Sequence, residues 1–266
     1  MSTLHFTLIQ THLHWEDKTA NLAMLEQKIM GIQERTEVVV LPEMFSTGFS
    51  MEPEKLAEEM DGETVGWMKK MAAAKKIILT GSVIIKDEGH YYNRLLWVQP
   101  DGNLGYYDKR HRFAFAGEDN EYTSGNKRLI AQVKGWKINL QVCYDLRFPV
   151  WARQQTGDAP EYDVLLYVAN WPDRRAHAWK TLLTARAIEN QCYVVGVNRV
   201  GDDGKGIHHG GDSMVIDPLG AVLYHKHEDE DIYTITLELE PLQQVREKFP
   251  FWKDADHFKI MPKDGE

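Results

Sequence analysis

Short apolar runs alternate with amphipathic stretches along all 266 residues of the sequence. Residues 18–33 place apolar side chains at spacings of three and four, which indicates one buried face of a helix. Apolar runs at 4–10 and 37–41 flank this segment and are typical of strands. The start of the chain therefore predicts a strand, a helix and a second strand.

Two turn motifs predict β-hairpins: Pro-Asp-Gly at 100–102 and Asp-Pro-Leu-Gly at 217–220. Helical crossovers combined with hairpins favour mixed α/β sheets with helices on their outer faces. Hairpin strands are predicted at 91–99, 104–109, 211–216 and 221–225, other strands at 76–85, 137–142, 164–168 and 191–198, and other helices at 55–75, 148–155 and 176–190.

The length fits either one large domain or two small ones. Hydrophobic residues make up 43% of the chain and charged residues 27%, which allows a sizeable core and excludes a disordered or fibrous protein. No internal repeat and no linker rich in Pro, Gly or Ser divides the sequence. We therefore expect one domain over residues 1–266.

Charge and cysteine content restrict the partners and the compartment. The formal net charge of −9 disfavours binding to nucleic acid or to an anionic membrane. No apolar run approaches the length of a membrane span, and the first residues do not resemble a secretory signal. Only Cys143 and Cys192 are present, so a disulfide framework is excluded and a cytoplasmic location is expected.

Three reactive side chains come directly after predicted strands, where loops of α/β proteins assemble sites. They are Glu43, Lys109 and Cys143. Each alone has an ordinary interpretation, as a solvated loop charge or, for the cysteine, as a small buried hydrophobe. Because a helix is predicted after Cys143, its N-terminus is expected to stabilise a thiolate there. Cys192 begins an apolar run without a flanking acid or base, so we expect it in the core.

Together the three residues supply the parts of one mechanism. A thiol nucleophile needs a base for its proton, a cation for the oxyanion, and an acid for a poor leaving group such as ammonia. Cys143, Lys109 and Glu43 can fill these roles. They are separated by 66 and 34 residues, so only the fold can bring them together.

Five motifs in order carry a resemblance that covers nearly the whole chain. They are LPEMF at 41–45, YDKRH at 107–111, VCYDLRFP at 142–149, YVANWP at 167–172 and ARAIENQ at 185–191. Each motif is weak alone, but the set and its order resemble the nitrilase, or carbon–nitrogen hydrolase, superfamily.

The resemblance implies a four-layer α-β-β-α sandwich of two mixed sheets that dimerises through helices. It makes Glu43 the general base and acid, Lys109 the stabiliser of the oxyanion, and Cys143 the nucleophile. A second glutamate that orients the lysine is expected before Gly125. Glu118 fits the usual offset better, while Glu121 remains an alternative. No cofactor is expected.

The closest likeness within the superfamily is to the omega-amidase branch, which implies hydrolysis of 2-oxo acids with a terminal amide, such as 2-oxoglutaramate and 2-oxosuccinamate. The backbone N–H of Tyr144 is expected to share the oxyanion with Lys109, and Asn170 and Trp171 to contact the substrate. Arg175 is our candidate for the far carboxylate, because a guanidinium matches a carboxylate in two hydrogen bonds. Arg174 and Arg147 compete with it, although Arg147 can also serve as a structural partner of Asp145.

Other functions are also compatible with the sequence. Within the superfamily the alternatives are hydrolysis of nitriles, of N-carbamoyl amides or of deaminated glutathione. A scaffold without catalysis is a further alternative, disfavoured because every triad position is filled. A papain-like Cys/His pair has only His111 inside a motif. Metal binding is disfavoured because no acidic or Cys partner stands at recognisable spacing from the paired histidines. Those pairs are His12 with His14, His208 with His209, and His225 with His227.

Overall fold

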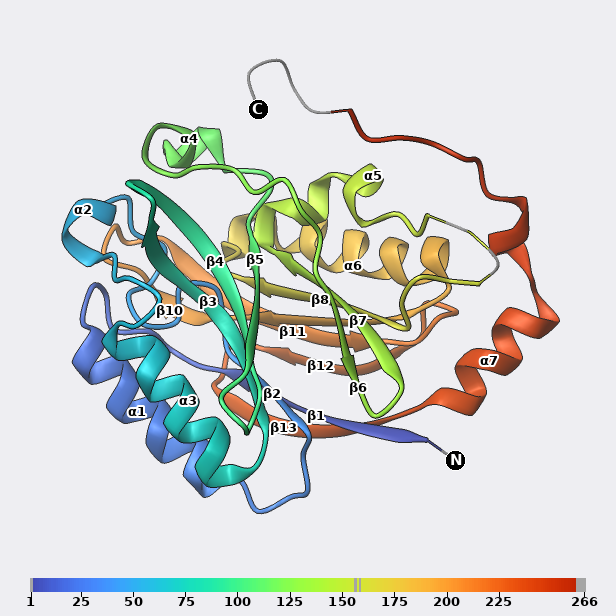
Figure 1. Cartoon of the computed structure of the whole chain (residues 1–266), viewed down its shortest axis with the longest axis horizontal. Coiled ribbons are helices and arrows are strands. Elements are labelled where there is room, and N and C mark those ends of the chain that lie inside the picture. Colours follow the sequence, from blue (N-terminus) through green and yellow to red (C-terminus); the bar gives the residue numbers. More distant parts are fainter. Residues whose placement is uncertain (1, 156, 158, 262–266) are drawn as a thin grey trace.

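Two mixed sheets stack face to face in the centre of the molecule (Figure 1). The computed structural model describes residues 2–155, 157 and 159–261. Strands β1, β2 and β3 of the first sheet run parallel, and its other neighbours pair antiparallel. In order across this sheet, the strands are β13 (Asp231–Glu238), β1 (Thr3–Gln10), β2 (Val38–Val40), β3 (Ile78–Asp87), β4 (His90–Val98) and β5 (Leu104–Asp108).

The second sheet has the same plan, with a parallel centre extended by antiparallel strands on both sides. Its strands in order are β10 (Val200–Asp202), β11 (His208–Ile216), β9 (Tyr193–Asn198), β8 (Val164–Ala169), β7 (Trp136–Val142) and β6 (Ile130–Val133), and β12 (Val222–His227) pairs with β11. These two sheets confirm the mixed α/β class predicted from the crossovers and hairpins.

Helices cover the outer face of each sheet, which makes four layers (Figure 1). Helices α1 (Lys18–Gly31) and α3 (Glu63–Lys75) pack on the first sheet, and α6 (Ala176–Asn190) packs on β9 and β11 of the second. The run of three valines in β2 follows from this arrangement. Val38 and Val40 join the core between the sheets, whereas Val39 joins the core under the helices. A strand buried on both faces needs apolar residues throughout.

Two predicted helices are shorter than the sequence analysis expects. The helix predicted at 55–75 is divided into α2 (Pro53–Leu56) and α3. Glu58 lies between them and is bound by its backbone to the edge of β3, and its carboxylate accepts the backbone N–H of Thr64 at 2.7 Å. These contacts outweigh the helical pattern. The helix predicted at 148–155 is reduced to α5 (Pro149–Ala152), after which Gln154 bonds instead to Asn190.

Several elements at the edges of the sheets were not predicted. They are β6, β10, β13 and α7 (Leu239–Lys248). Strand β13 pairs along the whole of β1, more than two hundred positions away in the chain, so local sequence gives little sign of its partner. In the described part of the chain, no helix combines the length and apolar character needed to cross a membrane.

Candidate active site

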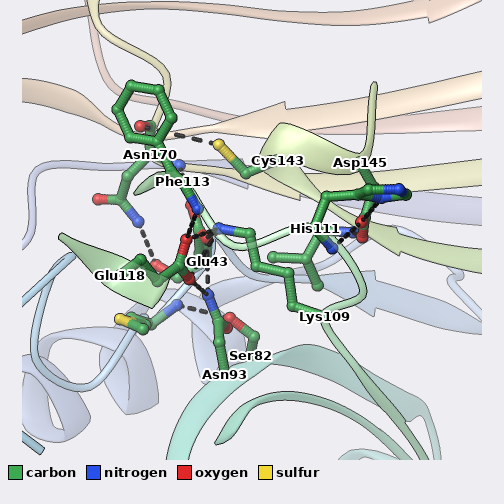
Figure 2. A network of polar contacts seen from close by, with 12 residues as sticks. Glu43, Ser82, Asn93, Lys109, His111, Phe113, Glu118, Cys143, Asp145 and Asn170 are labelled. Carbon is green, nitrogen blue, oxygen red and sulfur yellow. Dashed lines mark hydrogen bonds and ion pairs between the residues drawn. The ribbon is translucent and has the colours of Figure 1, made fainter. Parts of the chain in front are cut away.

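Three strand ends converge between the sheets and deliver Glu43, Lys109 and Cys143 to one place (Figure 2). Glu43 follows β2, Lys109 follows β5, and Cys143 follows β7. Glu118 joins them from the first position of the short helix α4 (Glu118–Glu121). The fold therefore brings together all four residues that the sequence analysis named for catalysis.

Lys109 lies between two carboxylates. Its Nζ is 2.8 Å from Oε1 of Glu43 and 2.8 Å from Oε2 of Glu118. The side chain of Lys109 is 1% exposed and those of both glutamates are 0% exposed. Glu121, the alternative second glutamate, is exposed and lies outside this network.

Two asparagines fix Glu43 in position. Asn93 donates from Nδ2 to Oε1 of Glu43 at 2.8 Å and also to Oε1 of Glu118 at 3.3 Å. The backbone N–H of Asn170 donates to Oε2 of Glu43 at 2.8 Å. Asn93 lies in the middle of β4 without any local motif, so its role could not be predicted from the sequence. Both oxygens of Glu43 are thus held by donors, which leaves its carboxylate little freedom to rotate.

Burial and the two carboxylates set the charge of the lysine. Burial alone would lower the pKa of Lys109, but the adjacent carboxylates of Glu118 and Glu43 raise it above its usual range. For Glu118, burial raises the pKa and the attraction of Lys109 offsets this only in part. Lys109 is therefore a permanently charged group at neutral pH.

The surroundings of Cys143 favour the neutral thiol over the thiolate. Burial raises its pKa well above the usual value, the charge of Glu43 raises it further, and Lys109 opposes both. The expectation of a stabilising helix N-terminus is wrong, since residues Cys143–Arg147 form only a short 3-10 helix. The Glu43 carboxylate is close enough to raise the pKa of the Cys143 thiol. It is therefore also close enough to accept the thiol proton during the reaction.

The backbone at Cys143 is strained, with a φ of +43° in the left-handed region that few residues other than glycine adopt. Asp145 holds this turn, because its carboxylate accepts the backbone N–H of Val142 at 3.0 Å and the hydroxyl of Tyr107 at 2.8 Å. His111 also bonds to Asp145, at 2.8 Å through Nδ1. This leaves His111 committed to the turn rather than to Cys143, which argues against a papain-like pair.

A pocket with a volume of about 210 Å³ opens above Cys143. Every residue predicted to contact the substrate lines it, namely Tyr144, Asn170, Trp171 and Arg175. Several further lining residues were not predicted from the sequence, including Phe49, Phe113, Lys205, Ile207 and His209. They come from loops and from the start of β11, so their sequence neighbours give no sign of a shared wall.

Three guanidinium groups and Lys205 outnumber Asp203 in the pocket lining, which gives the pocket a positive charge. Arg147, Arg174 and Arg175 all line it, and in the described residues none of them is within ion-pair distance of a carboxylate. Burial lowers the pKa of Arg175, and the charges of Arg174 and Arg147 lower it further. Arg147 stacks on the ring of Trp171 at 4.9 Å instead of pairing with Asp145, so its suggested structural role is wrong. These guanidinium groups therefore favour the binding of an anionic group in the pocket.

Comparison with known proteins decides the family. The model of the carbon–nitrogen hydrolase family matches residues 6–247. The chain belongs to this family. As a carbon–nitrogen hydrolase, it is 46% identical over 262 residues to the omega-amidase YafV of Escherichia coli strain K12, covering 98% of this chain and 100% of that protein. It is also 32% identical to the 2-oxoglutaramate amidase of Bacillus subtilis strain 168, covering 92% of this chain and 95% of that one.

The same relation appears among solved structures. This carbon–nitrogen hydrolase superposes with a TM-score of 0.96 on XC1258 of Xanthomonas campestris, a CN-hydrolase superfamily protein with an arsenic adduct in its active site. The two sequences are 45% identical, and the match covers 98% of this chain and 100% of XC1258. The likeness confirms the nitrilase-like sandwich that the five motifs imply.

Proposed function

We propose that the protein is an omega-amidase that converts 2-oxo dicarboxylic acid monoamides, such as 2-oxoglutaramate and 2-oxosuccinamate, to the 2-oxo acid and ammonia. The observation that carries this proposal is the buried Glu43–Lys109–Glu118 network beside Cys143, at the base of a pocket lined by unpaired arginines. The network supports amide hydrolysis, and the arginines support a substrate with a carboxylate. The identities to YafV and to the 2-oxoglutaramate amidase support the substrate class.

Acylation begins with transfer of the thiol proton of Cys143 to Glu43 as the sulfur attacks the amide carbon. The oxyanion of the tetrahedral intermediate is stabilised by Nζ of Lys109 and by the backbone N–H of Tyr144. Glu43 then gives its proton to the departing nitrogen, the carbon–nitrogen bond breaks, and ammonia leaves a thioester. The neutral resting thiol suits this sequence, because its proton is transferred only when the carbon–sulfur bond forms.

Deacylation repeats these steps with water. Glu43 takes a proton from water as its oxygen attacks the thioester carbon, and Lys109 with Tyr144 again holds the oxyanion. Collapse of this intermediate breaks the carbon–sulfur bond, and the sulfur recovers the proton held by Glu43. The product is the 2-oxo acid and the enzyme returns to its starting state.

The far carboxylate of the substrate is proposed to bind Arg175, with Arg174 and Arg147 as neighbours in the same wall. Trp171 fixes this wall, because its indole N–H donates to the backbone carbonyl of Arg175 at 2.9 Å. The backbone carbonyl of Asn170 lies 4.0 Å from Sγ of Cys143, which places this residue next to the nucleophile.

Replacing Cys143 with Ser tests the reaction. We expect ammonia release from 2-oxoglutaramate to fall by at least about 1,000-fold, since the thiol nucleophile is lost. Cys192→Ser is the matched control, because Cys192 is buried in the core without a catalytic partner. Full activity of the Cys143 variant, with an unchanged unfolding temperature, would contradict the mechanism. A panel including propanamide, a nitrile and deaminated glutathione separates omega-amidase activity from that of related amidases.

Single-domain organisation, the homodimer and the cytoplasmic location also belong to this proposal. Support for the dimer comes from the outer face of α6, where Ile188 is 51% exposed beside the exposed Leu219 of the adjoining hairpin. Support for the compartment comes from two cysteines that are both unpaired. Light scattering after size-exclusion chromatography tests the dimer, and a monomer at micromolar concentration would contradict it.

A further inference from the structure

Imidazoles and carboxylates alternate along the outer end of the second sheet, close to the pocket but outside the catalytic network. The residues come from β10, β11 and β12 and from the turn that follows β12. In order of contact they are Asp202, His208, Glu228, His227, Asp212 and His225.

Two of these histidines are oriented in the same way. Nδ1 of His227 lies 3.2 Å from the buried carboxylate of Asp212, and its Nε2 lies 3.3 Å from Glu228. Nδ1 of His208 lies 2.8 Å from Asp202, and its Nε2 lies 3.4 Å from Glu228. In both histidines, Nδ1 contacts a carboxylate of the sheet and Nε2 lies beside the carboxylate of Glu228.

A third segment of the chain adds Asp173. One ligand atom each from Asp173, His227 and Glu228 lies within 4.8 Å of the others. Gly210 makes this approach possible, because a Cβ at that position would be 2.6 Å from Oδ1 of Asp173 and 3.0 Å from Cε1 of His227. The carbonyl of Gly210 also accepts the backbone N–H of Glu228 at 2.8 Å. The side chains of Asp173, His227 and Glu228 thus meet beside Gly210, which has no side chain to keep them apart.

The charge at this place favours a cation. Asp173, Glu228, Asp202 and Asp212 supply four carboxylates, and of these Asp212 has an ion pair with Lys180 at 3.3 Å. Ligands about 2.0–2.1 Å from a tetrahedral zinc ion are separated from one another by about 3.3 Å. The distance from Glu228 to Nε2 of His227, 3.3 Å, matches this separation.

We propose that His227, Glu228 and Asp173 form a binding site for a transition-metal dication of the Zn²⁺ type. Imidazole and carboxylate ligands suit these ions, and the Asp212 carboxylate lies 3.2 Å from Nδ1 of His227 and so orients that imidazole. From the sequence, a metal at His225 and His227 is disfavoured because no acidic or Cys partner stands at a recognisable spacing. The fold supplies those partners from β11 and from the turn at Asp173.

The site is connected to the pocket through that turn. Asp173 begins the 3-10 turn Asp173–Arg175, and both residues that follow it line the pocket. A metal ion on Asp173 would hold this turn in place. We therefore expect metal binding to lower KM for 2-oxoglutaramate and to leave kcat unchanged. This second effect rests on the proposed function, whereas binding itself does not.

Titration of the full-length, chelator-treated protein with Co²⁺ tests the site, since tetrahedral Co²⁺ absorbs in the visible range. We expect one Co²⁺ per chain in the wild type and displacement by Zn²⁺. Asp173→Asn and His227→Ala should each weaken binding at least tenfold. His90→Ala, at an exposed histidine on β4, is the matched control and should bind as the wild type does.

Two further measurements keep the result unambiguous. Cys143→Ala should retain the visible band, because the ligands contain no thiol; its loss would assign the metal to the catalytic cysteine and overturn the proposal. Circular dichroism of the metal-free variants checks the fold, and the near-isosteric Asp173→Asn serves if His227→Ala does not fold. Absence of Co²⁺ binding to the wild type, or equal binding by Asp173→Asn, would show that hydrogen bonds alone hold this cluster.

Discussion

Single residues in the active site are held more tightly than their motifs suggest. Glu43 has both carboxylate oxygens occupied by donors, and Lys109 bridges it to Glu118. Such a network reduces the reorganisation needed when charge develops on the substrate oxygen. In the pocket, the fold likewise holds three positively charged arginines together. Little rearrangement is therefore needed when an anionic substrate group binds.

Glu118→Gln should reduce kcat by about 10- to 100-fold, because Lys109 loses a charge-assisted hydrogen bond worth about 1.5–3 kcal/mol. As Glu118 acts through Lys109 rather than on the substrate, KM should change little. The pH profile of kcat should also shift, which a purely structural defect would not produce. Glu121→Gln is the matched control, and equal losses in both variants would refute the assignment of Glu118.

Arg175→Ala should raise KM for 2-oxoglutaramate by about 10- to 100-fold, as expected for loss of a charge-assisted contact of about 1.5–3 kcal/mol. Steady-state kinetics with propanamide provide the comparison, because that amide lacks a carboxylate and its KM should not rise. An unchanged KM for 2-oxoglutaramate would transfer this role to Arg147 or Arg174.

At the scale of elements, the position of Glu43 depends on strand β3. The loop after β2 continues alongside this strand, with the backbone N–H of Leu41 bonded to Thr80 at 2.8 Å and that of Phe45 to Ser82 at 3.1 Å. Gly81 lies between these two anchor points. A Cβ there would be 2.7 Å from the ring of Phe45 and 2.8 Å from Cβ of Leu41.

Gly81→Ala should therefore destabilise the fold by about 1–3 kcal/mol, the usual cost of overpacking, and should lower kcat by displacing the Glu43 loop. Gly66→Ala in helix α3 is the matched control, because no heavy atom lies within 4 Å of a Cβ there. That change should stabilise the protein by about 0.5–1 kcal/mol. Urea unfolding measures both values, and a neutral Gly81 variant would contradict the close packing.

At the scale of the whole molecule, the stability of the stacked sheets is linked to pH through buried ionisable groups. Burial lowers the pKa of His209 to about 4, and the charge of Arg199 lowers it further. An unfolded histidine titrates near pH 6.5. The unfolded chain therefore binds more protons between about pH 6.5 and pH 4, so the contribution of His209 to stability is complete above this window and is lost as pH falls through it.

His209→Gln should reduce the dependence of stability on pH. Between pH 7.5 and pH 5 the wild type should lose about 2 kcal/mol through this histidine, and the variant should lose that much less. Urea unfolding at the two pH values gives the comparison, with His90→Gln as the control at an exposed site. Identical pH dependence in wild type and His209→Gln would show that His209 is not held neutral in the fold.

The central strands and most of the long helices, the five motifs and the strand-end positions of Glu43, Lys109 and Cys143 could be predicted from the sequence. These features are local, because periodicity and turn residues act over a few positions. The division of 55–75 into two helices could not be predicted, since it depends on the contact of Glu58 with β3.

The properties that depend on residues far apart in the sequence were determined only by the tertiary structure. The choice of Glu118 over Glu121 as the neighbour of Lys109, the neutral thiol of Cys143 and the contribution of Asn93 all arise from contacts between separate strands. The alternation of histidines with carboxylates has the same origin, since Asp173 and His227 meet only across Gly210. Sequence determines which groups are available, whereas burial and distance, which only the fold sets, determine their charge and their partners.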